Sequence, residues 1–293
     1  MEHQLWKEIL AIIRVIDKPR RNPRCRYSCE DIVLVWFWAV LHDRPVSWAC
    51  KRRNWPFHQW RRRLPSNSRM SVRLRTQEVQ DLIQEIEART LCAKGPPPLV
   101  WALDAKPLVI GSCSKDRQAG FGRAAQSKAK GYKLHAIVGM DGSISAWRVA
   151  PMNKDERVMA RRLLPEAKIQ GYLLADGNYD SNRLHEICAE RGELQLLTPP
   201  RGGYGCTKRD RRQSPGRRRM LELLEAPQPC FGRQLLETRD AIERHFGNLT
   251  NWGGGLACLP SWARTHRRVH RWVQAKLILD ALKHPPRKRT YVN

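Results

Sequence analysis

The sequence predicts an α/β fold in which helices flank a mixed β-sheet, preceded by an all-helical N-terminal region. Two observations support this class. Apolar residues follow helical spacing in the N-terminal third, and after a proline-rich linker they form short, nearly continuous runs that are typical of buried strands. Beyond the linker, three expected strands come before an alternation of helices and strands, an order that favours a mixed sheet with helices on both faces.

The N-terminal region, residues 1–95, is predicted to consist of helices. Apolar side chains recur at helical spacing through residues 5–16. Ser28, followed three residues later by Asp31, resembles a capping box in front of the apolar run 32–41. A helix is therefore expected to begin directly after Ser28.

A short basic segment follows this helix. Pro45 is expected to end the helix, and residues 46–55 would then display the cations of residues 51–53. This order is compatible with a helix-turn-helix that reads DNA ends, and equally with a dimerisation or packing role. A further amphipathic helix over 79–88 and the proline-rich linker 93–98 complete the region.

The first strand expected after the linker is the apolar run 99–103, which closes on Asp104. Two more strands are expected within residues 131–151, on either side of Asp141–Gly142, because Asp-Gly is a strong signal for a tight hairpin turn. An ionised carboxylate beside a core strand is costly unless it is paired or binds a cation. Asp104 is therefore a candidate functional residue.

The remaining elements are expected to alternate along the chain. The resulting order from residue 98 to 249 is that of the ribonuclease H-like fold. The expected elements are a helix over 154–164, a strand over 171–176 that ends on Asp176, a helix over 180–191, a strand over 193–199, a basic loop over 200–235, a helix over 237–249 and a tail helix over 266–283.

The charge of the chain points to a polyanionic partner. Its 54 Lys and Arg residues against 28 Asp and Glu residues give a net charge of +26. Such an excess attracts phosphate backbones. A membrane surface is the competing partner, but the sequence shows no basic amphipathic anchor, no signal peptide and no apolar run near the ~20 residues that span a bilayer. The nine cysteines are scattered, so reduced thiols in a cytoplasmic protein are expected.

Three carboxylates have positions that suggest joint chemistry. Asp104 and Asp176 each follow a predicted strand, and Glu243 lies on a late helix. If the two strands are parallel neighbours, the aspartates emerge side by side, and carboxylate oxygens suit Mg²⁺ or Mn²⁺. Two such ions can hold the attacking and leaving oxygens of a phosphoryl displacement. Singly, each residue also fits an ordinary role, a turn or helix cap for the aspartates and a surface ion pair for Glu243.

Four stretches of the chain carry a resemblance to a known family. They read WALDAK (101–106), KAKGYKLHAIVGMDG (128–142), LLADGNYDS (173–181) and TRDAIERHFGNLTNW (238–252). In this order they resemble the DDE transposases of bacterial insertion sequences. The last stretch is similar to the arginine and glutamate signature of that family, with Arg239 and Glu243 at the matching positions.

The resemblance implies that different segments of the chain have different functions. Residues 1–95 would bind transposon ends, residues 96–284 would form a ribonuclease H-like catalytic domain with the basic loop 200–235, and residues 285–293 would be a basic tail. Asp104, Asp176 and Glu243 would hold two Mg²⁺ or Mn²⁺ ions. The implied activity is cleavage of double-stranded DNA at transposon ends and strand transfer into a target. The protein would act as a homo-oligomer on DNA, in the bacterial cytoplasm and associated with the nucleoid.

The chain departs from the fuller family signature at two positions. Leu236 replaces a tyrosine, and Thr250 replaces a lysine, both of which serve transposon-end contacts in the family. Two alternatives to a transposase therefore remain open. One is a nuclease or domesticated relative that cuts DNA without strand transfer, and the other is a basic DNA-binding protein without catalysis.

Several basic residues are candidates for contacts with the DNA backbone. Lys133 and His135 are expected on one face of a strand, opposite the apolar side chains at 132, 134 and 136. A solvated strand face explains the same alternation. The predicted DNA contacts are Lys106, Lys128, Lys130, Lys133, His135, Arg239 and Arg244.

Overall fold

The computed structural model describes most of the chain. The described residues are 2–16, 25–56, 63–92, 95–111, 114–124, 127–201, 213–227, 230–239, 246–247, 256 and 258–284. Within them, no helix is long and apolar enough to cross a membrane.

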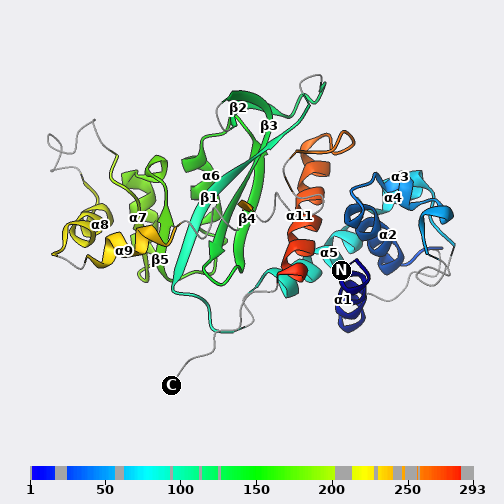
Figure 1. Cartoon of the computed structure of the whole chain (residues 1–293), viewed down its shortest axis with the longest axis horizontal. Helices are drawn as coiled ribbons and strands as arrows, with labels where there is room; N and C mark the ends of the chain where they lie inside the picture. Colours follow the sequence, from blue (N-terminus) through cyan, green and yellow to red (C-terminus); the bar gives the residue numbers. More distant parts are fainter. Residues whose placement is uncertain are drawn as a thin grey trace.

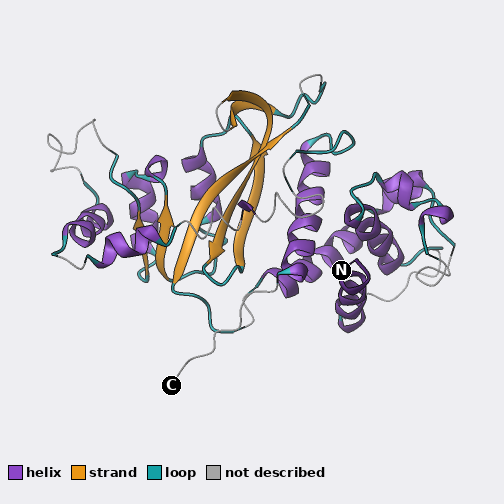
Figure 2. Ribbon diagram, viewed as in Figure 1, coloured by secondary structure: helices purple, strands orange, loops and turns teal. Residues whose placement is uncertain are grey.

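Among the described residues, helices come first and last along the chain and alternate with strands between them (Figures 1 and 2). The helices are α1 (Glu2–Val15), α2 (Cys29–Leu41), α3 (Val46–Ala49), α4 (Asn67–Arg73), α5 (Gln77–Leu91), α6 (Glu156–Leu163), α7 (Asn182–Glu190), α8 (Pro215–Glu225), α9 (Phe231–Glu237) and α11 (His266–Lys283), with the short 3₁₀ helices η1 (Arg52–Asn54) and η2 (Gly177–Tyr179). The strands are β1 (Val100–Val109), β2 (Gly120–Ala124), β3 (Ser127–Gly139), β4 (Ile144–Pro151), β5 (Gly171–Ala175) and β6 (Leu194–Leu197).

The six strands form one mixed sheet. Its order is β2-β3-β1-β5-β6, and β4 pairs with β3. β1 runs antiparallel to β3 and parallel to β5, which in turn runs parallel to β6. The strand pairings and the flanking helices confirm the predicted mixed α/β sheet of a ribonuclease H-like fold.

Helices cover both faces of the sheet. On one face, Tyr132, Leu134 and Ala136 of β3 join a core that also contains side chains of α11 and of the N-terminal helices. On the other face, Ile137 joins a second core with side chains of α6 and α7. Because the part of β3 from Gly131 to Gly139 is covered on both faces, the alternation there does not leave a solvated side.

The N-terminal helices pack on the sheet through α11. Figure 1 shows α11 (red) between the strands and the bundle of α1 to α5. The carboxylate of Glu87 in α5 accepts hydrogen bonds from Trp147 Nε1 of β4 (2.6 Å) and from Gln274 Nε2 of α11 (2.5 Å). Residues from both predicted domains thus share one core, and the division at residues 95 and 96 remains a prediction.

The predicted start of α2 has the expected capping geometry. The Ser28 hydroxyl accepts from Asp31 N, and the Asp31 carboxylate accepts from Ser28 N. This reciprocal pair satisfies two backbone N–H groups that the first turn leaves without partners. The next helix, α3, is only four residues long, while the cations of residues 51–53 are exposed. A helix-turn-helix with a full-length second helix is therefore not formed here.

The first strand is longer than the apolar run predicted. β1 continues through Asp104 to Val109 because β3 pairs with it over that whole length. Backbone nitrogens point alternately to the two sides of a strand. Ile110 N donates to Lys130 O of β3, so the nitrogen of Pro107, three residues earlier, points away from β3. On that side β5 has already ended, and Pro107 therefore removes no hydrogen bond between strands. Asp104 is thus a mid-strand residue, not a strand terminus.

Two further differences concern segments expected to lack regular structure. β2 pairs with the first part of β3, and it was not predicted. Within the basic loop predicted over 200–235, α8 and α9 are helical. Ser214 caps α8 by accepting from Arg217 N, and Pro215 occupies the first helical position, where its missing N–H costs nothing.

Candidate active site

Asp104 and Asp176 lie next to each other at the point where two parallel strands part. The register pairs Leu103 of β1 with Ala175 of β5, and the aspartates are the next residue on each strand. β5 ends there, whereas β1 continues along β3. The sequence prediction that these two carboxylates meet at one edge of the sheet is consistent with this register.

Local hydrogen bonds fix both carboxylates. Asp104 Oδ1 accepts from the backbone N–H of Ala105 at 2.7 Å. Asp176 caps η2, and its two oxygens accept from Asn178 N (2.9 Å) and Asn178 Nδ2 (3.1 Å). The ordinary capping role considered for Asp176 is therefore real, and it holds the side chain at the end of the sheet.

The electrostatics of Asp104 show that its charge is poorly compensated within the protein. Burial raises the pKa of Asp104 to about 6, and the neighbouring charges of Asp176 and Glu156 act in the same direction. The Ala105 N–H and the Arg239 guanidinium oppose this rise without cancelling it. A carboxylate in this situation gains from a nearby cation.

Tyr179 and Glu156 complete the surroundings of the two aspartates. Tyr179 is buried on η2, and its hydroxyl has no hydrogen-bond partner among the described residues. Burial, followed by the charges of Glu156, Asp104 and Asp176, raises the pKa of Tyr179 well above its ordinary value. The Tyr179 hydroxyl therefore lies within electrostatic range of three carboxylates.

Two of the predicted basic residues lie within range of these acidic groups. Lys106 is two positions beyond Asp104 on β1, and burial lowers the pKa of its ammonium while the Asp104 charge raises it. Lys133 Nζ pairs with Glu156 Oε1 at 2.5 Å, and both side chains are mostly buried. Lys106 is therefore near Asp104, whereas Lys133 is already paired with a carboxylate of α6.

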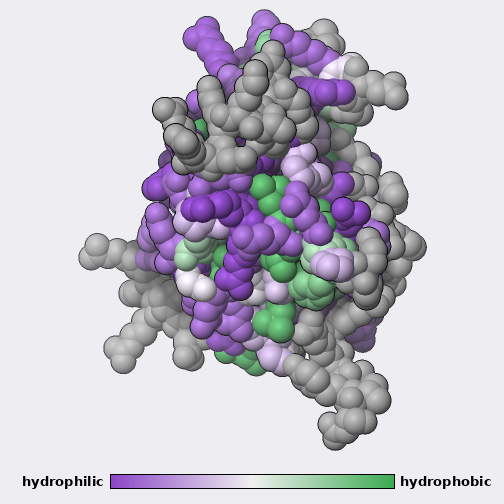
Figure 3. Space-filling model, turned by 90° about the vertical axis from the view of Figure 1, so that its left-hand side faces the viewer, coloured by the Kyte–Doolittle hydropathy of each residue, from purple (hydrophilic) through white to green (hydrophobic). Residues whose placement is uncertain are grey.

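Arg239, from a distant part of the sequence, acts electrostatically on the same site. It follows α9, whose first residue, Phe231, packs edge-to-face on Tyr172 of β5 with ring centroids 5.4 Å apart. Figure 3 views the end of the molecule that carries α8 and α9, where hydrophilic side chains surround a small hydrophobic area. The Phe231 contact holds the first turn of α9 on β5, and the charge of Arg239, two residues beyond the helix, opposes the rise in the pKa of Asp104.

The other predicted DNA contacts have different surroundings. Lys128 is exposed on the β2–β3 hairpin, where it pairs in register with Arg123. Lys130 Nζ donates to Ser114 O at 3.1 Å and lies 5.9 Å from the centroid of the Phe121 ring. This hairpin is therefore a basic arm at the first part of β3, whereas Asp104 pairs in register with Ala136, further along the same strand.

His135 does not fit its predicted role. It is 1% exposed, and burial, followed by the charge of Lys133, lowers its pKa to about 4. Neither ring nitrogen has a hydrogen-bond partner among the described residues. A side chain enclosed in this way cannot touch a DNA backbone, so the prediction of a direct His135 contact is wrong.

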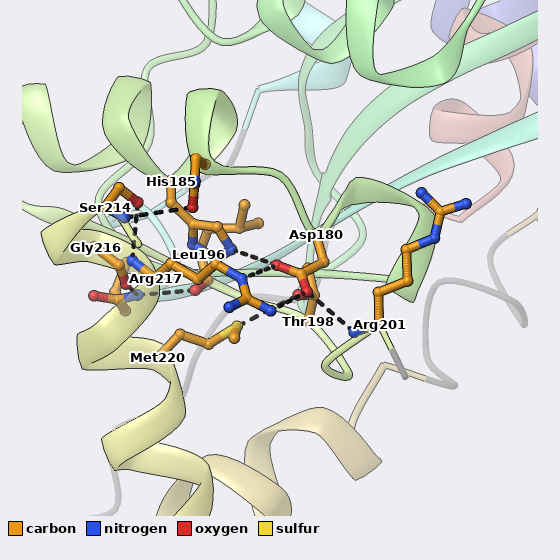
Figure 4. A network of polar contacts seen from close by, with 11 residues as sticks. Asp180, His185, Leu196, Thr198, Arg201, Ser214, Gly216, Arg217 and Met220 are labelled. Carbon is orange, nitrogen blue, oxygen red and sulfur yellow. Dashed lines mark hydrogen bonds and ion pairs between the residues drawn. The ribbon is translucent and has the colours of Figure 1, made fainter. Parts of the chain in front are cut away.

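A buried ion-pair network anchors the turn that carries Asp176 (Figure 4). Asp180 follows η2, and its carboxylate accepts from Arg217 Nε and a terminal Arg217 nitrogen, both at 2.8 Å. The same carboxylate contacts His185 Nε2 (3.2 Å) and accepts from Arg201 N (3.0 Å). These contacts hold the pKa of Asp180 far below its ordinary range, even though burial alone would raise it. The network ties η2 to α7 and α8.

The donor set fits a divalent cation. Two adjacent carboxylates, one of them with a raised pKa, offer the oxygen ligands that Mg²⁺ and Mn²⁺ prefer. Among the described residues, no three His, Cys, Asp or Glu side chains are grouped so as to hold a metal. Glu243, the third predicted ligand, and Arg244 lie outside the described residues.

Sequence reasoning missed Glu156, Tyr179 and Asp180. Glu156 belongs to a helix that follows β4, so no local pattern connects it with Asp104. A weak signal existed for Tyr179, an aromatic residue in the polar stretch DGNYD, but none for Asp180, because aspartate is common in turns. Their burial depends on contacts with α6 and α8, which a single sequence does not show.

The comparison with protein families agrees with this geometry. A family model described as a transposase DDE domain matches residues 95–275, which include β1, β5, Asp104 and Asp176. No curated protein has a matching sequence. The match covers more than half of the 293 residues. The chain therefore belongs to the family of transposases with a DDE domain.

Proposed function

We propose that this transposase cleaves double-stranded DNA at transposon ends and joins the freed ends to a target, with Asp104, Asp176 and Glu243 as the ligands of two Mg²⁺ or Mn²⁺ ions. The observation that carries the proposal is the adjacency of Asp104 and Asp176, together with the poorly compensated charge of Asp104. Divalent ions at such a site supply activation of the attacking oxygen and stabilisation of the leaving oxygen.

Glu243 is proposed as the third ligand through its neighbour in sequence. Arg239 acts electrostatically on Asp104, and Glu243 follows four residues later in the stretch that resembles the family signature. Residues four apart share one face of a helix. On the helix that the sequence alone predicts over 237–249, Glu243 would share a face with Arg239.

The residues around the carboxylates suit a phosphodiester substrate. Lys106 and Arg239 bring positive charge to within electrostatic range of Asp104, where a scissile phosphate would lie. Their charges would hold the phosphate in place and offset negative charge that builds up on it. Lys133 is paired with Glu156, so its proposed role is to orient that carboxylate and not to bind DNA directly.

The DNA is proposed to extend from this site along basic surfaces. Lys128 and Lys130 on the β2–β3 arm are proposed backbone contacts, and Arg244 is proposed on the basis of sequence alone. Residues 1–95 are proposed to recognise the ends, in an oligomer that holds two ends together at the bacterial nucleoid. Contacts to phosphates predict an affinity that falls steeply with salt.

The test is a cleavage and joining assay on duplexes that carry the inverted repeats flanking the gene. Asp104→Ala, Asp176→Ala and Glu243→Ala should each reduce Mg²⁺-dependent cleavage by about 100-fold or more while DNA binding persists, because each removes part of the metal site. Glu193→Gln, at an exposed carboxylate outside the site and outside residues 1–95, is the control and should cleave normally. Normal cleavage by any of the three variants would remove that residue from the site.

The second half of the assay separates strand transfer from plain cleavage. Joined products with a second duplex would support the transposase activity. Cleavage without joining would instead support a nuclease. This alternative arises because Leu236 and Thr250 stand where the family has residues that contact transposon ends.

A further inference from the structure

A cavity lies between the N-terminal helices and α11, outside the proposed active site. Its volume is about 260 Å³, which is below the ~300–1,000 Å³ typical of drug-sized ligand sites. None of the residues that line it belongs to the sheet or to α6–α9. They include Trp36, Ser47, Asn67, Trp262, Arg268 and Arg271. We refer to it as the α2–α11 cavity.

Three tryptophans form the aromatic part of this lining. Trp272 of α11 makes edge-to-face contacts with Trp36 of α2 (6.3 Å between ring centroids) and with Trp262 (6.1 Å). The indole N–H groups of Trp36 and Trp262 are buried and donate to no acceptor among the described residues. A buried indole N–H usually has a partner. The fold therefore leaves two donors beside the cavity unused.

The charged side chains in the lining are two arginines, and no carboxylate is among the lining residues. Arg268 is exposed, and Arg271 is half-buried with one terminal nitrogen donating to Leu74 O at 2.6 Å. Burial and the nearby charges of Arg267, Arg75 and Arg268 lower the pKa of Arg271 to about 10. Several uncompensated guanidinium groups thus meet at this opening, which favours an anionic ligand.

Small polar side chains supply neutral hydrogen-bonding groups. The Ser47 hydroxyl and the Asn67 amide make no hydrogen bond to any described residue. An amide can both donate and accept, as the edge of a nucleobase requires. Aromatic faces, guanidinium groups and free amide and hydroxyl groups are the combination with which proteins hold unstacked bases.

We propose that the α2–α11 cavity binds a single unpaired nucleotide of a DNA strand, with the base against the half-buried Trp262 and its phosphate on Arg268 and Arg271. The inference rests on the proposed function only in taking DNA as the ligand. The volume is far too small for a duplex, so only a base that has left the base stack could enter, with its phosphate at the opening. A free nucleotide shares this chemistry, and the experiment separates the two sources.

The test compares two labelled duplexes of one sequence, one fully paired and one with a single extra nucleotide on one strand. Binding to the full chain is measured by fluorescence anisotropy without divalent metal. Base stacking on aromatic side chains predicts about 5- to 150-fold tighter binding of the bulged duplex. Trp262→Ala and Arg268→Gln should remove that preference. Arg267→Gln, at an exposed neighbour that does not line the cavity, should keep it.

Each outcome bears on the inference. Equal affinity of the wild-type chain for the two duplexes overturns it and leaves DNA binding intact. Failure to bind either duplex overturns both the inference and the proposed function. A preference that survives both Trp262→Ala and Arg268→Gln also overturns it. Deoxyadenosine monophosphate is the probe for the free ligand: binding that depends on Trp262, without a preference for the bulge, would reassign the cavity to a free nucleotide.

Two checks guard against misfolding as the cause of a lost preference. Arg268→Gln changes an exposed side chain, so it tests the cavity even if Trp262→Ala unfolds the region. Asn67→Ala, at an exposed residue of α4, should reduce the preference without affecting binding of the paired duplex. Thermal unfolding of each variant verifies that the fold is retained.

Discussion

Replacing Asp104 with asparagine should stabilise the metal-free protein. In the folded state the pKa of Asp104 is about 6, against an ordinary value of 3.8, because burial and the charge of Asp176 disfavour the carboxylate. Since one pKa unit corresponds to about 1.4 kcal/mol, the ionised Asp104 costs about 3 kcal/mol of folding free energy above pH 6. An asparagine keeps the shape and removes the charge.

The sign of the effect gives a definite pH dependence. A carboxyl with a raised folded-state pKa binds its proton more tightly in the folded state, so its cost is absent below about pH 4 and grows as the pH rises toward 6. Asp104→Asn should therefore unfold at higher urea concentration than the wild type at pH 8, by about 3 kcal/mol, and the gain should nearly vanish at pH 4. Urea unfolding at several pH values, with EDTA present, measures this difference.

Addition of metal should reverse the order of stability. Mg²⁺ or Mn²⁺ binds the folded wild type and raises its stability by mass action, whereas Asp104→Asn has lost one ligand and should gain less. Asp81→Asn, at an exposed carboxylate, is the matched control and should follow the wild type throughout. An Asp104→Asn variant that is less stable than the wild type at pH 8 without metal would refute the argument from burial and repulsion.

The remaining predictions concern residues that support the site. Asp180→Asn removes the carboxylate charge that pairs with the buried Arg217 guanidinium and should cost about 3–5 kcal/mol in urea unfolding. Because the pKa of Asp180 is held low in the folded state, this contribution of the wild type should be lost as the pH falls below about 4. Gly171→Ala should cost about 1–3 kcal/mol in the same measurement, since Gly171 has φ of 86° and an added Cβ would collide with the Leu99 carbonyl. Burial lowers the pKa of His135 to about 4, so the folded protein loses stability between pH 6.5 and 4, where the unfolded chain binds a proton that the folded core excludes. His135→Phe should reduce this loss of stability. An unchanged dependence of stability on pH over this range would contradict the burial of His135.

The sequence predicted the sheet and the neighbourhood of Asp104 and Asp176, but for a partly different reason. The prediction that each aspartate follows the end of a strand holds for Asp176, which comes directly after β5. Asp104 follows only the part of β1 that pairs with β5, because β1 itself continues along β3. The length of β1 depends on its pairing with β3, which is a non-local property. Local patterns were more dependable, as the reciprocal bonds of Ser28 and Asp31 show.

The failures share a physical origin in tertiary contacts. The alternation of β3 correctly placed Lys133 and His135 on one face, but α6 covers that face and buries His135. In the segment 200–235 the high density of arginine suggested a loop, although Ser214 and Pro215 are a good helix start. Glu156 was out of reach, because only the packing of α6 on the sheet brings it within electrostatic range of Asp104.

The position of α11 sets the order in which the molecule can be completed during synthesis. Apolar side chains of α2 and α5 share their core with Val269, Trp272 and Val273 of a helix that leaves the ribosome long after them. Until α11 emerges, the nascent N-terminal helices keep a hydrophobic face open to solvent. A ribosome stalled within the central sheet would thus carry an incomplete bundle that chaperones can recognise, and messages truncated before residue 266 would yield chains prone to aggregation rather than separate DNA-binding fragments.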